Sequence, residues 1–229
     1  MLSAMILGAD LAEKSGMDNF SGAAFMVFPL ALHSLDILAS TIGMAFIKTK
    51  KGLPFYDASY GEMEDSLDVM KRGFKIAVFT GVIGFIVLAR MLLEYNGSWL
   101  NLAGCGLTGI AISYIFILST QYYTDYHYGP VKNIAESSKT GHATNIIAGL
   151  SVGLESTAIP VISITVGIII AYYLGETSGI TDSSGKSIGG LYGTAIATMG
   201  MFSNGVFVLG MSGFGPIADN AGGIVEMSH

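Results

Sequence analysis

Five long apolar stretches constrain this sequence more than any other feature. They are residues 23–47, 74–93, 100–120, 156–174 and 190–214. Each has roughly the 20 residues that a helix, at about 1.5 Å per residue, needs to cross a hydrocarbon core of about 30 Å. Lipid offers the backbone no hydrogen-bond partner, and the stretches lack the strict alternation of barrel strands. We therefore expect an all-α, polytopic membrane helix bundle with five full transmembrane helices.

The composition agrees with a membrane domain and excludes several other classes of protein. Only 12% of the residues are charged, against about 25% in a typical soluble domain, and 51% are hydrophobic. The mean hydropathy is +0.58. The net charge of −6 argues against a nucleic-acid-binding domain, and the single cysteine, Cys105, excludes a disulfide scaffold.

Both ends of the sequence indicate a piece of a larger protein. Residues 1–9 are apolar but cover only about half a bilayer, so we expect them to be the end of a partial N-terminal helix. They lack the basic start of a signal peptide, since Lys14 is the first basic residue. The chain stops at His229, soon after a glycine-rich polar run. We expect residues 1–229 to form a single membrane domain.

The basic residues predict which helix ends face the cytoplasm. Most of the eleven lysines and arginines fall between the first two spans or between the third and fourth: Lys48, Lys50, Lys51, Lys71, Arg72, Lys75, Lys132 and Lys139. The positive-inside rule places this side in the cytoplasm and residues 10–22, 94–99 and 175–189 outside. Residues 214–229 then lie on the cytoplasmic side, and residues 144–155 are expected to extend the fourth span there. Arg90 and Glu94 have the spacing of a helical ion pair.

The strongest candidate for chemistry is the run at residues 214–227, which contains Asp219, Asn220 and Glu226. Carboxylate and amide oxygens of this kind suit Mg²⁺, which often binds a phosphate at the same time. A turn that leaves a membrane helix uses the same residue types, and it is the simpler alternative.

Three other groups of polar residues each leave two alternatives open. His33 and Asp36, one helical turn apart inside the first span, carry a proton or ion, or else pair with each other. Residues 121–125 line a site or form an interfacial aromatic belt. Residues 139–145 bind an anion at a helix start, or form a Thr or Asn cap in a basic loop, and they lack the spacing of a phosphate loop.

Four motifs, in this order, resemble the membrane-integral pyrophosphatases, which pump H⁺ or Na⁺ by hydrolysing inorganic diphosphate. They are Q-Y-Y-T at 121–124, P-V at 130–131, S-S-K-T-G-H-A-T-N-I-I-A-G-L-S-V-G-L-E-S-T-A-I-P-V at 137–161, and G-P-I-A-D-N-A-G-G-I-V-E-M at 215–227. The resemblance covers essentially the whole chain, while the chain covers only a central part of the family's sequence.

The resemblance implies a homodimer, each subunit of about sixteen helices in the lipid bilayer of the cell's inner or plasma membrane. It implies Mg²⁺ and diphosphate bound on the cytoplasmic side, export of H⁺ or Na⁺ from the cytoplasm and no nucleic-acid partner, and it leaves K⁺ open as an activator. The family's metal-site aspartate falls on Asp219. It assigns no catalytic or substrate-binding residue within this chain.

The sequence also departs from the family pattern. Ser212 stands where the family usually has an aspartate, seven residues or about two helical turns before Asp219. Ser212 and Asn204 are therefore candidates for the ion pathway. The family's other Asp- and Lys-bearing segments are not among these residues, so we expect the chain alone not to hydrolyse diphosphate. The alternatives are a transporter or channel subunit without hydrolase activity, and an inactive truncated remnant.

Overall fold

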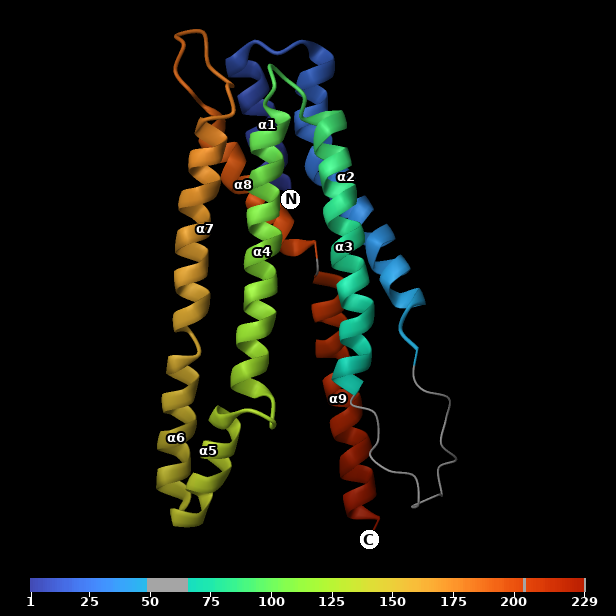
Figure 1. The fold of residues 1–229 in the computed structure, drawn as a ribbon, viewed down its shortest axis with the longest axis vertical. Helices are drawn as coiled ribbons and strands as arrows, with labels where there is room; N and C mark the ends of the chain where they lie inside the picture. Colours follow the sequence, from blue (N-terminus) through green and yellow to red (C-terminus); the bar gives the residue numbers. More distant parts are fainter. Residues whose placement is uncertain (49–65, 204, 229) are drawn as a thin grey trace.

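The computed structural model describes residues 1–48, 66–203 and 205–228, and helices dominate these ranges (Figure 1). The long helices are α2 (Asn19–Ala45), α3 (Ser66–Leu92), α4 (Trp99–Thr124), α7 (Ala158–Glu176) and α9 (Gly205–Met227). The short ones are α1 (Leu2–Ser15), α5 (Gly129–Ser137), α6 (His142–Glu155) and α8 (Gly189–Phe202), with a 3-10 turn at Ser138–Thr140. The prediction of an all-α bundle is confirmed.

Four segments of the described chain are long and apolar enough to cross a membrane, and a bent pair of helices can supply a fifth. The four segments are Asn19–Ala45, Val69–Leu92, Trp99–Thr140 and His142–Glu176. The last of them joins α6 to α7, as expected for a fourth span that continues through residues 144–155. These lengths agree with the predicted number of spans in a multi-pass membrane protein.

The fifth predicted span, residues 190–214, is wrong as a single continuous helix. α8 ends at Phe202, α9 begins at Gly205, and the two helices are bent by 42° relative to each other. The Ser203 amide and hydroxyl both donate to the carbonyl of Gly200, at 3.2 and 2.8 Å, which tightens the last turn of α8. Serine and glycine are weak helix formers, so this is a position where a helix breaks at low cost.

Two further boundaries differ from the expectation. α1 continues to Ser15, so Asp10 and Lys14, which were expected in a loop, lie on a helix and pair at 2.7 Å. At the other end, α9 continues to Met227, so the run at residues 214–227 is helical and not a turn. The turn alternative for the Asp219 run is therefore wrong.

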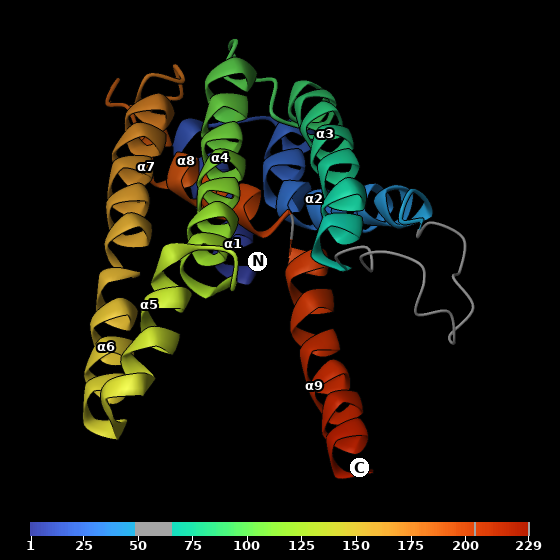
Figure 2. The ribbon, with the colours of Figure 1, turned by 60° about the horizontal axis from the view of Figure 1, so that its bottom comes forward.

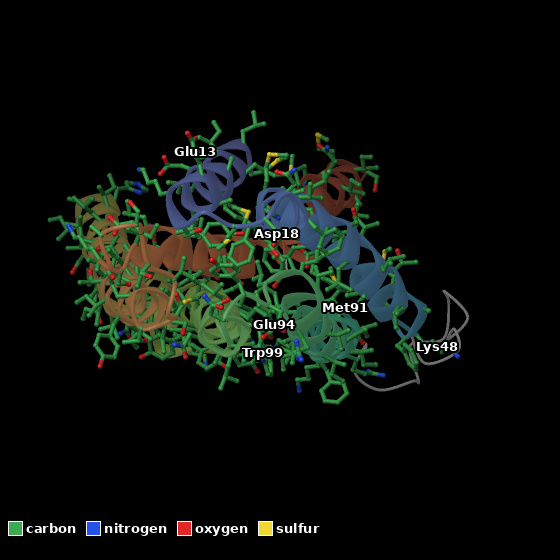
Figure 3. The ribbon with its side chains drawn as sticks, turned by 90° about the horizontal axis from the view of Figure 1, so that it is seen from above. Glu13, Asp18, Lys48, Met91, Glu94 and Trp99 are labelled. Carbon is green, nitrogen blue, oxygen red and sulfur yellow. The ribbon has the colours of Figure 1, made fainter. Side chains whose placement is uncertain are left out.

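The connections between helices sort to two ends of the bundle (Figure 1). The α1–α2, α3–α4 and α7–α8 connections lie at one end, and Figure 3 views the molecule from that end, with Asp18, Glu94 and Trp99 labelled. The start of α3, the α5–α6 hairpin and the end of α9 lie at the other, which we call the basic end. Lys50 and Lys51 fall outside the described residues. The arrangement has the two-sided order that the basic residues predict.

The predicted ion pair at the non-basic end is present. Arg90 Nη1 lies 2.7 Å from Glu94 Oε2, and both side chains are exposed. The Arg90 guanidinium also lies 5.4 Å from the ring centroid of Trp99. A long cationic side chain held between a carboxylate and an indole is typical of a helix end at the membrane–water boundary.

α8 is the central helix of the bundle and contacts α1, α2, α4 and α7 (Figure 3). Its contact with α4 depends on glycines. A Cβ placed on Gly109 would collide with the backbone carbonyl of Ala197, and one on Gly200 would collide with that of Gly106. Without side chains at these positions the two backbones approach closely, which is how membrane helices gain packing contacts in the absence of a hydrophobic driving force.

A buried tyrosine joins α8 to α2. The Tyr192 ring stacks on Phe25 with 5.5 Å between centroids, and its hydroxyl donates to the Phe25 carbonyl at 2.6 Å. The residue four positions after Phe25 is Pro29, which has no N–H to offer that carbonyl within the helix. Tyr192 therefore supplies the donor that the proline removes, at a site where water cannot.

Candidate functional site

Asp219 lies in the C-terminal half of α9 and its side chain is exposed. Ser212 and Glu226 lie seven residues before and after it, so the three residues share one face of the helix. Pro216 stands inside the helix between Ser212 and Asp219 and cannot donate to the Ser212 carbonyl. This face therefore presents two carboxylates, a hydroxyl and a carbonyl without its helical donor.

The face of α9 that carries Asp219 is not covered by other described residues. Phe207, near the start of the helix, is buried against Phe74, whereas residues 212–226 are mostly exposed. A Cβ on Gly213, Gly215 or Gly222 would meet no atom within 4 Å. Figures 1 and 2 both show this half of α9 standing apart from α5 and α6. A glycine-rich polar face of this kind is a surface on which another helix can pack closely.

Asp219 is the residue predicted to bind Mg²⁺, and this role stays a prediction. The described residues contain no group of three His, Cys, Asp or Glu side chains placed to hold a metal ion. Mg²⁺ takes six oxygen ligands and is commonly bound through one or two carboxylates, with waters and substrate phosphates completing the shell. Asp219 fits the role of one such carboxylate. It does not make a complete site by itself.

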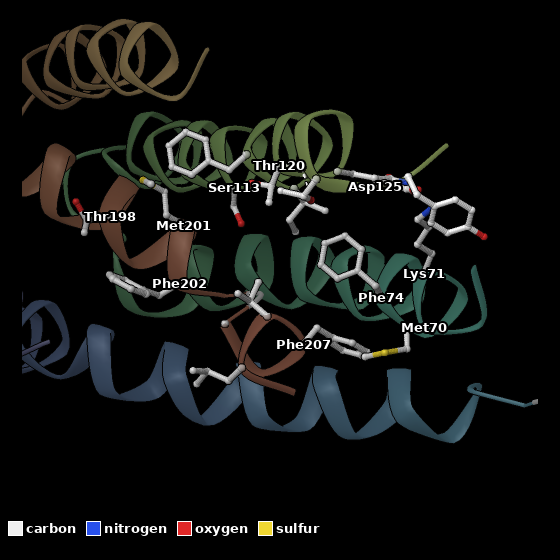
Figure 4. Close-up of a pocket in the computed structure, with 18 residues that line it drawn as sticks. Met70, Lys71, Phe74, Ser113, Thr120, Asp125, Thr198, Met201, Phe202 and Phe207 are labelled. Carbon is white, nitrogen blue, oxygen red and sulfur yellow. Dashed lines mark hydrogen bonds between the residues drawn. The ribbon is translucent and has the colours of Figure 1, made fainter. Parts of the chain in front are cut away.

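A cavity of about 970 Å³ lies between α3, α4 and the junction of α8 with α9 (Figure 4). Most of its wall is apolar, with Phe74, Met201, Phe202 and Phe207 among the residues that line it. Polar groups line it too, at Ser113, Thr120, Gln121 and Thr198, and Lys71 and Asp125 stand together at one end (Figure 4). One lysine beside a carboxylate is little positive charge for holding an anion such as diphosphate.

Residues 121–125 have features of both predicted alternatives, a site lining and an aromatic cluster. Gln121 and Asp125 line the cavity. Asp125 accepts hydrogen bonds from Gln121 Nε2 at 3.2 Å and from the His127 amide at 3.0 Å, and these bonds end α4. Tyr122 packs edge-on against Tyr123 and Tyr128, with centroids 5.0 and 5.5 Å apart. The tyrosines form the aromatic cluster, and the polar residues line the cavity.

The Thr or Asn cap predicted for residues 139–145 is wrong. The residue that precedes α6 is Gly141, with φ of 125°, and no side chain caps the helix. The Thr140 hydroxyl instead donates to the carbonyl of Ser137 at 2.8 Å, and the Thr144 hydroxyl lies 2.8 Å from the carbonyl of Gly141 and 3.1 Å from that of Ser137. Glycine adopts this backbone conformation readily, and the chain changes direction here so that Thr144 lies beside the end of α5. The anion-binding alternative stays a prediction.

The two ion-pathway candidates and the intramembrane pair have different positions. Ser212 is exposed on α9, and Asn204 falls outside the described residues. His33 Nδ1 lies 3.4 Å from Asp36 Oδ2 on α2, with the Asp36 side chain 6% exposed and that of His33 33% exposed. The structure therefore favours pairing of His33 with Asp36, and it does not bring either residue to Asp219.

Known proteins resemble this chain along its whole length. A sequence profile of the family described as inorganic H⁺ pyrophosphatase matches residues 1–229. The chain is 48% identical over 232 residues, all of the chain, to "Pyrophosphate-energized membrane proton pump 3" of Arabidopsis thaliana. It is 44% identical over 234 residues, 96% of the chain, to "K(+)-insensitive pyrophosphate-energized proton pump 2" of Moorella thermoacetica.

These relatives are much longer than the chain, which spans 28% of the Arabidopsis protein and 32% of the Moorella protein. A third relative is of similar length. It is "Pyrophosphate-energized proton pump 2" of Mycoplana dimorpha, 37% identical over 210 residues, which are 90% of this chain and 92% of that sequence.

Proposed function

The chain belongs to the inorganic H⁺ pyrophosphatase family, and on that premise we propose that it is part of a membrane pump that couples diphosphate hydrolysis to ion translocation. The match over residues 1–229 supports this proposal over a non-hydrolytic transporter or channel subunit. The names of the relatives favour H⁺ over Na⁺ as the pumped ion, and the Moorella name favours activity without K⁺.

The observation that carries the proposal is the exposed face of α9 around Asp219. Asp219 lies in the motif that resembles the family's metal site and is held on a helix, where its carboxylate has a defined direction. We assign it one bond to Mg²⁺, on the side of the membrane where the basic residues lie, which is the cytoplasmic side by the positive-inside rule. Bound Mg²⁺ would neutralise charge on the diphosphate.

A complete site needs more groups than α9 offers. A diphosphate with its metal ions requires several carboxylates and cations, and Asp219 provides one. The uncovered glycine-rich face fits the close approach of further helices that carry those groups. We therefore propose that the 229-residue chain alone does not hydrolyse diphosphate, and that the active protein is a homodimer of larger subunits.

The ion pathway is proposed to run along the same face of α9. Ser212 lies about 10 Å from Asp219 along the helix axis, two turns toward the bend. A serine hydroxyl can pass a proton through a hydrogen bond, but unlike an aspartate it cannot hold a charge between steps. We propose that the ion passes Ser212 and also Asn204, which falls outside the described residues, and that Ser212 weakens the coupling of hydrolysis to pumping.

The test uses membrane vesicles that contain the protein at its full natural length, with Asp219→Asn as the variant. We expect Mg²⁺-dependent phosphate release from diphosphate to fall at least about 10-fold, the lower end of the range for losing an outer-shell partner of a metal ligand. Asp10→Asn is the matched control, since Asp10 is an exposed carboxylate near the opposite end. Unchanged hydrolysis in Asp219→Asn would contradict the metal role, and hydrolysis by the isolated chain would contradict the incomplete site.

A further inference from the structure

His33 and Asp36 lie on α2 at the depth of the hydrocarbon core. α2 runs from Asn19 to Ala45, which places Asp36 about 25 Å from the start of the helix and about 14 Å from its end at 1.5 Å per residue. A hydrocarbon core of about 30 Å, centred on a helix of about 40 Å, includes both residues. Ionisable groups at this depth are rare, and they usually face the protein interior and pair with one another.

The carboxylate of Asp36 is buried and incompletely paired. Asp36 is 5% exposed, and its Oδ2 has no hydrogen-bond partner in the described part of the chain. The ring nitrogen His33 Nδ1 lies 3.4 Å from this oxygen, too long for a well-formed hydrogen bond. The imidazole of His33 is therefore the described group best placed to share a proton with this carboxylate.

No other charge in the described residues is placed to compensate Asp36. Asp36 continues the buried stripe of Phe28 and Leu32 toward α3 and α8. α2 also contacts α1 and α9. α8, residues 76–89 of α3 and residues 205–218 of α9 contain no charged residue.

The titratable groups of these neighbouring helices lie farther along or have other partners. Lys71, Arg72 and Lys75 of α3 surround Gly73, which packs on Gly43, about 10 Å along α2 from Asp36. Arg90 pairs with Glu94, and Asp10 with Lys14, with Glu13 beside them on α1; Asp219 and Glu226 lie beyond residue 218 on α9. The Tyr192 hydroxyl is bonded to Phe25.

We propose that His33 and Asp36 form a proton-binding site inside the membrane, in which the two side chains together hold one proton at neutral pH. With one proton the pair has no net charge, whichever of Nδ1 and Oδ2 carries it. Without the proton it would leave an uncompensated carboxylate in hydrocarbon, which is strongly disfavoured. This site is on α2, separate from Asp219 on α9, so it does not depend on the proposed hydrolysis.

The first test is spectroscopic, on the full chain in lipid nanodiscs with histidine labelled by ¹⁵N. At about pH 7.5, an exposed imidazole with a pKa of about 6.5 is protonated in about one molecule in ten. We expect the pair to be protonated in most molecules. The signal is either an acid C=O infrared band that Asp36→Asn removes, or an imidazolium signal that His33→Gln removes. An ionised carboxylate beside a neutral imidazole in most molecules would overturn the proposal.

The second test measures thermal unfolding in detergent between about pH 6 and pH 9. Raising the pH draws the proton from the pair and leaves a buried charge, so we expect the wild-type midpoint to fall over this range. Asp36→Asn should lack most of that fall, and Asp10→Asn, which removes an exposed carboxylate, should keep it. If Asp36→Asn does not fold, His33→Gln is measured instead. In that variant the Asp36 carboxyl must hold the proton alone, so we expect the midpoint to fall over a different pH range from that of the wild type. The wild-type pH slope in every pair variant that folds would contradict the site.

Discussion

Tyr192→Phe is the most informative substitution in the bundle, because the hydroxyl it removes replaces a donor that Pro29 cannot provide. Tyr192 is 1% exposed, and its hydroxyl donates to the Phe25 carbonyl at 2.6 Å. In the variant this carbonyl keeps neither a helical donor nor a side-chain donor. A buried polar group left without a partner costs about 1–3 kcal/mol, more than the net value of an ordinary hydrogen bond.

The free-energy cost translates into a measurable shift. For a chain of this size each kcal/mol lowers the unfolding midpoint by roughly 2–4 °C, so we expect a fall of about 2–12 °C. The single cysteine provides the assay, since Cys105 is fully buried on α4 and reacts with a fluorogenic maleimide only as the bundle opens. Tyr173→Phe is the control, because Tyr173 is an exposed tyrosine on α7.

A second background isolates the mechanism. Pro29→Ala restores an N–H four residues after Phe25, so the carbonyl regains a helical donor whether or not Tyr192 is present. We expect Tyr192→Phe to cost at least about 1 kcal/mol less in this background, a coupling typical of residues that share one partner. An equal cost in both backgrounds would refute the reasoning, since the loss would then come from the hydroxyl alone and not from the orphaned carbonyl.

Two further substitutions test the packing and the α7–α8 loop. Gly109→Ala should destabilise the chain by about 1–3 kcal/mol, because the added Cβ meets the Ala197 backbone. Gly81→Ala is the control and should not destabilise it, because its Cβ would meet no atom within 4 Å. Equal unfolding midpoints for the two variants, measured by Cys105 labelling, would contradict this. A hydrogen bond from the Ser184 hydroxyl and others from the Lys186 and Ser184 amides lower the pKa of Asp182 below its ordinary value. The loop should therefore be most stable above the ordinary aspartate pKa of about 3.9 and lose that stability as pH falls through the lowered pKa. Hydrogen exchange at Ser184 and Lys186, corrected for intrinsic rates, should show this in wild type and not in Asp182→Asn.

Residue order alone was enough to predict some features. Asp219 was predicted as a metal ligand because its run is distinctive, and this stays a prediction. The Arg90–Glu94 ion pair was predicted because a helix repeats every 3.6 residues, and it is present. The cavity could not be found in this way. Its lining combines Lys71 and Phe74 of α3 with Thr198 and Phe202 of α8, and only packing brings these helices together. Pro29 indicated that the Phe25 carbonyl needs a hydrogen-bond donor from outside its own helix. Which residue supplies that donor depended on the fold.

The sequence by itself determined the class of structure and its sidedness. Apolar runs of bilayer length must be helical, because hydrocarbon leaves the backbone no other partner, and the basic residues sort to one end. The tertiary structure alone decided where the fifth span bends and that Asp36 is buried beside His33. It also decided that Tyr192 donates a hydrogen bond to the Phe25 carbonyl, 167 positions away in the sequence. These properties depend on which side chains face each other across helices, and the period of a single helix contains no information about its neighbours.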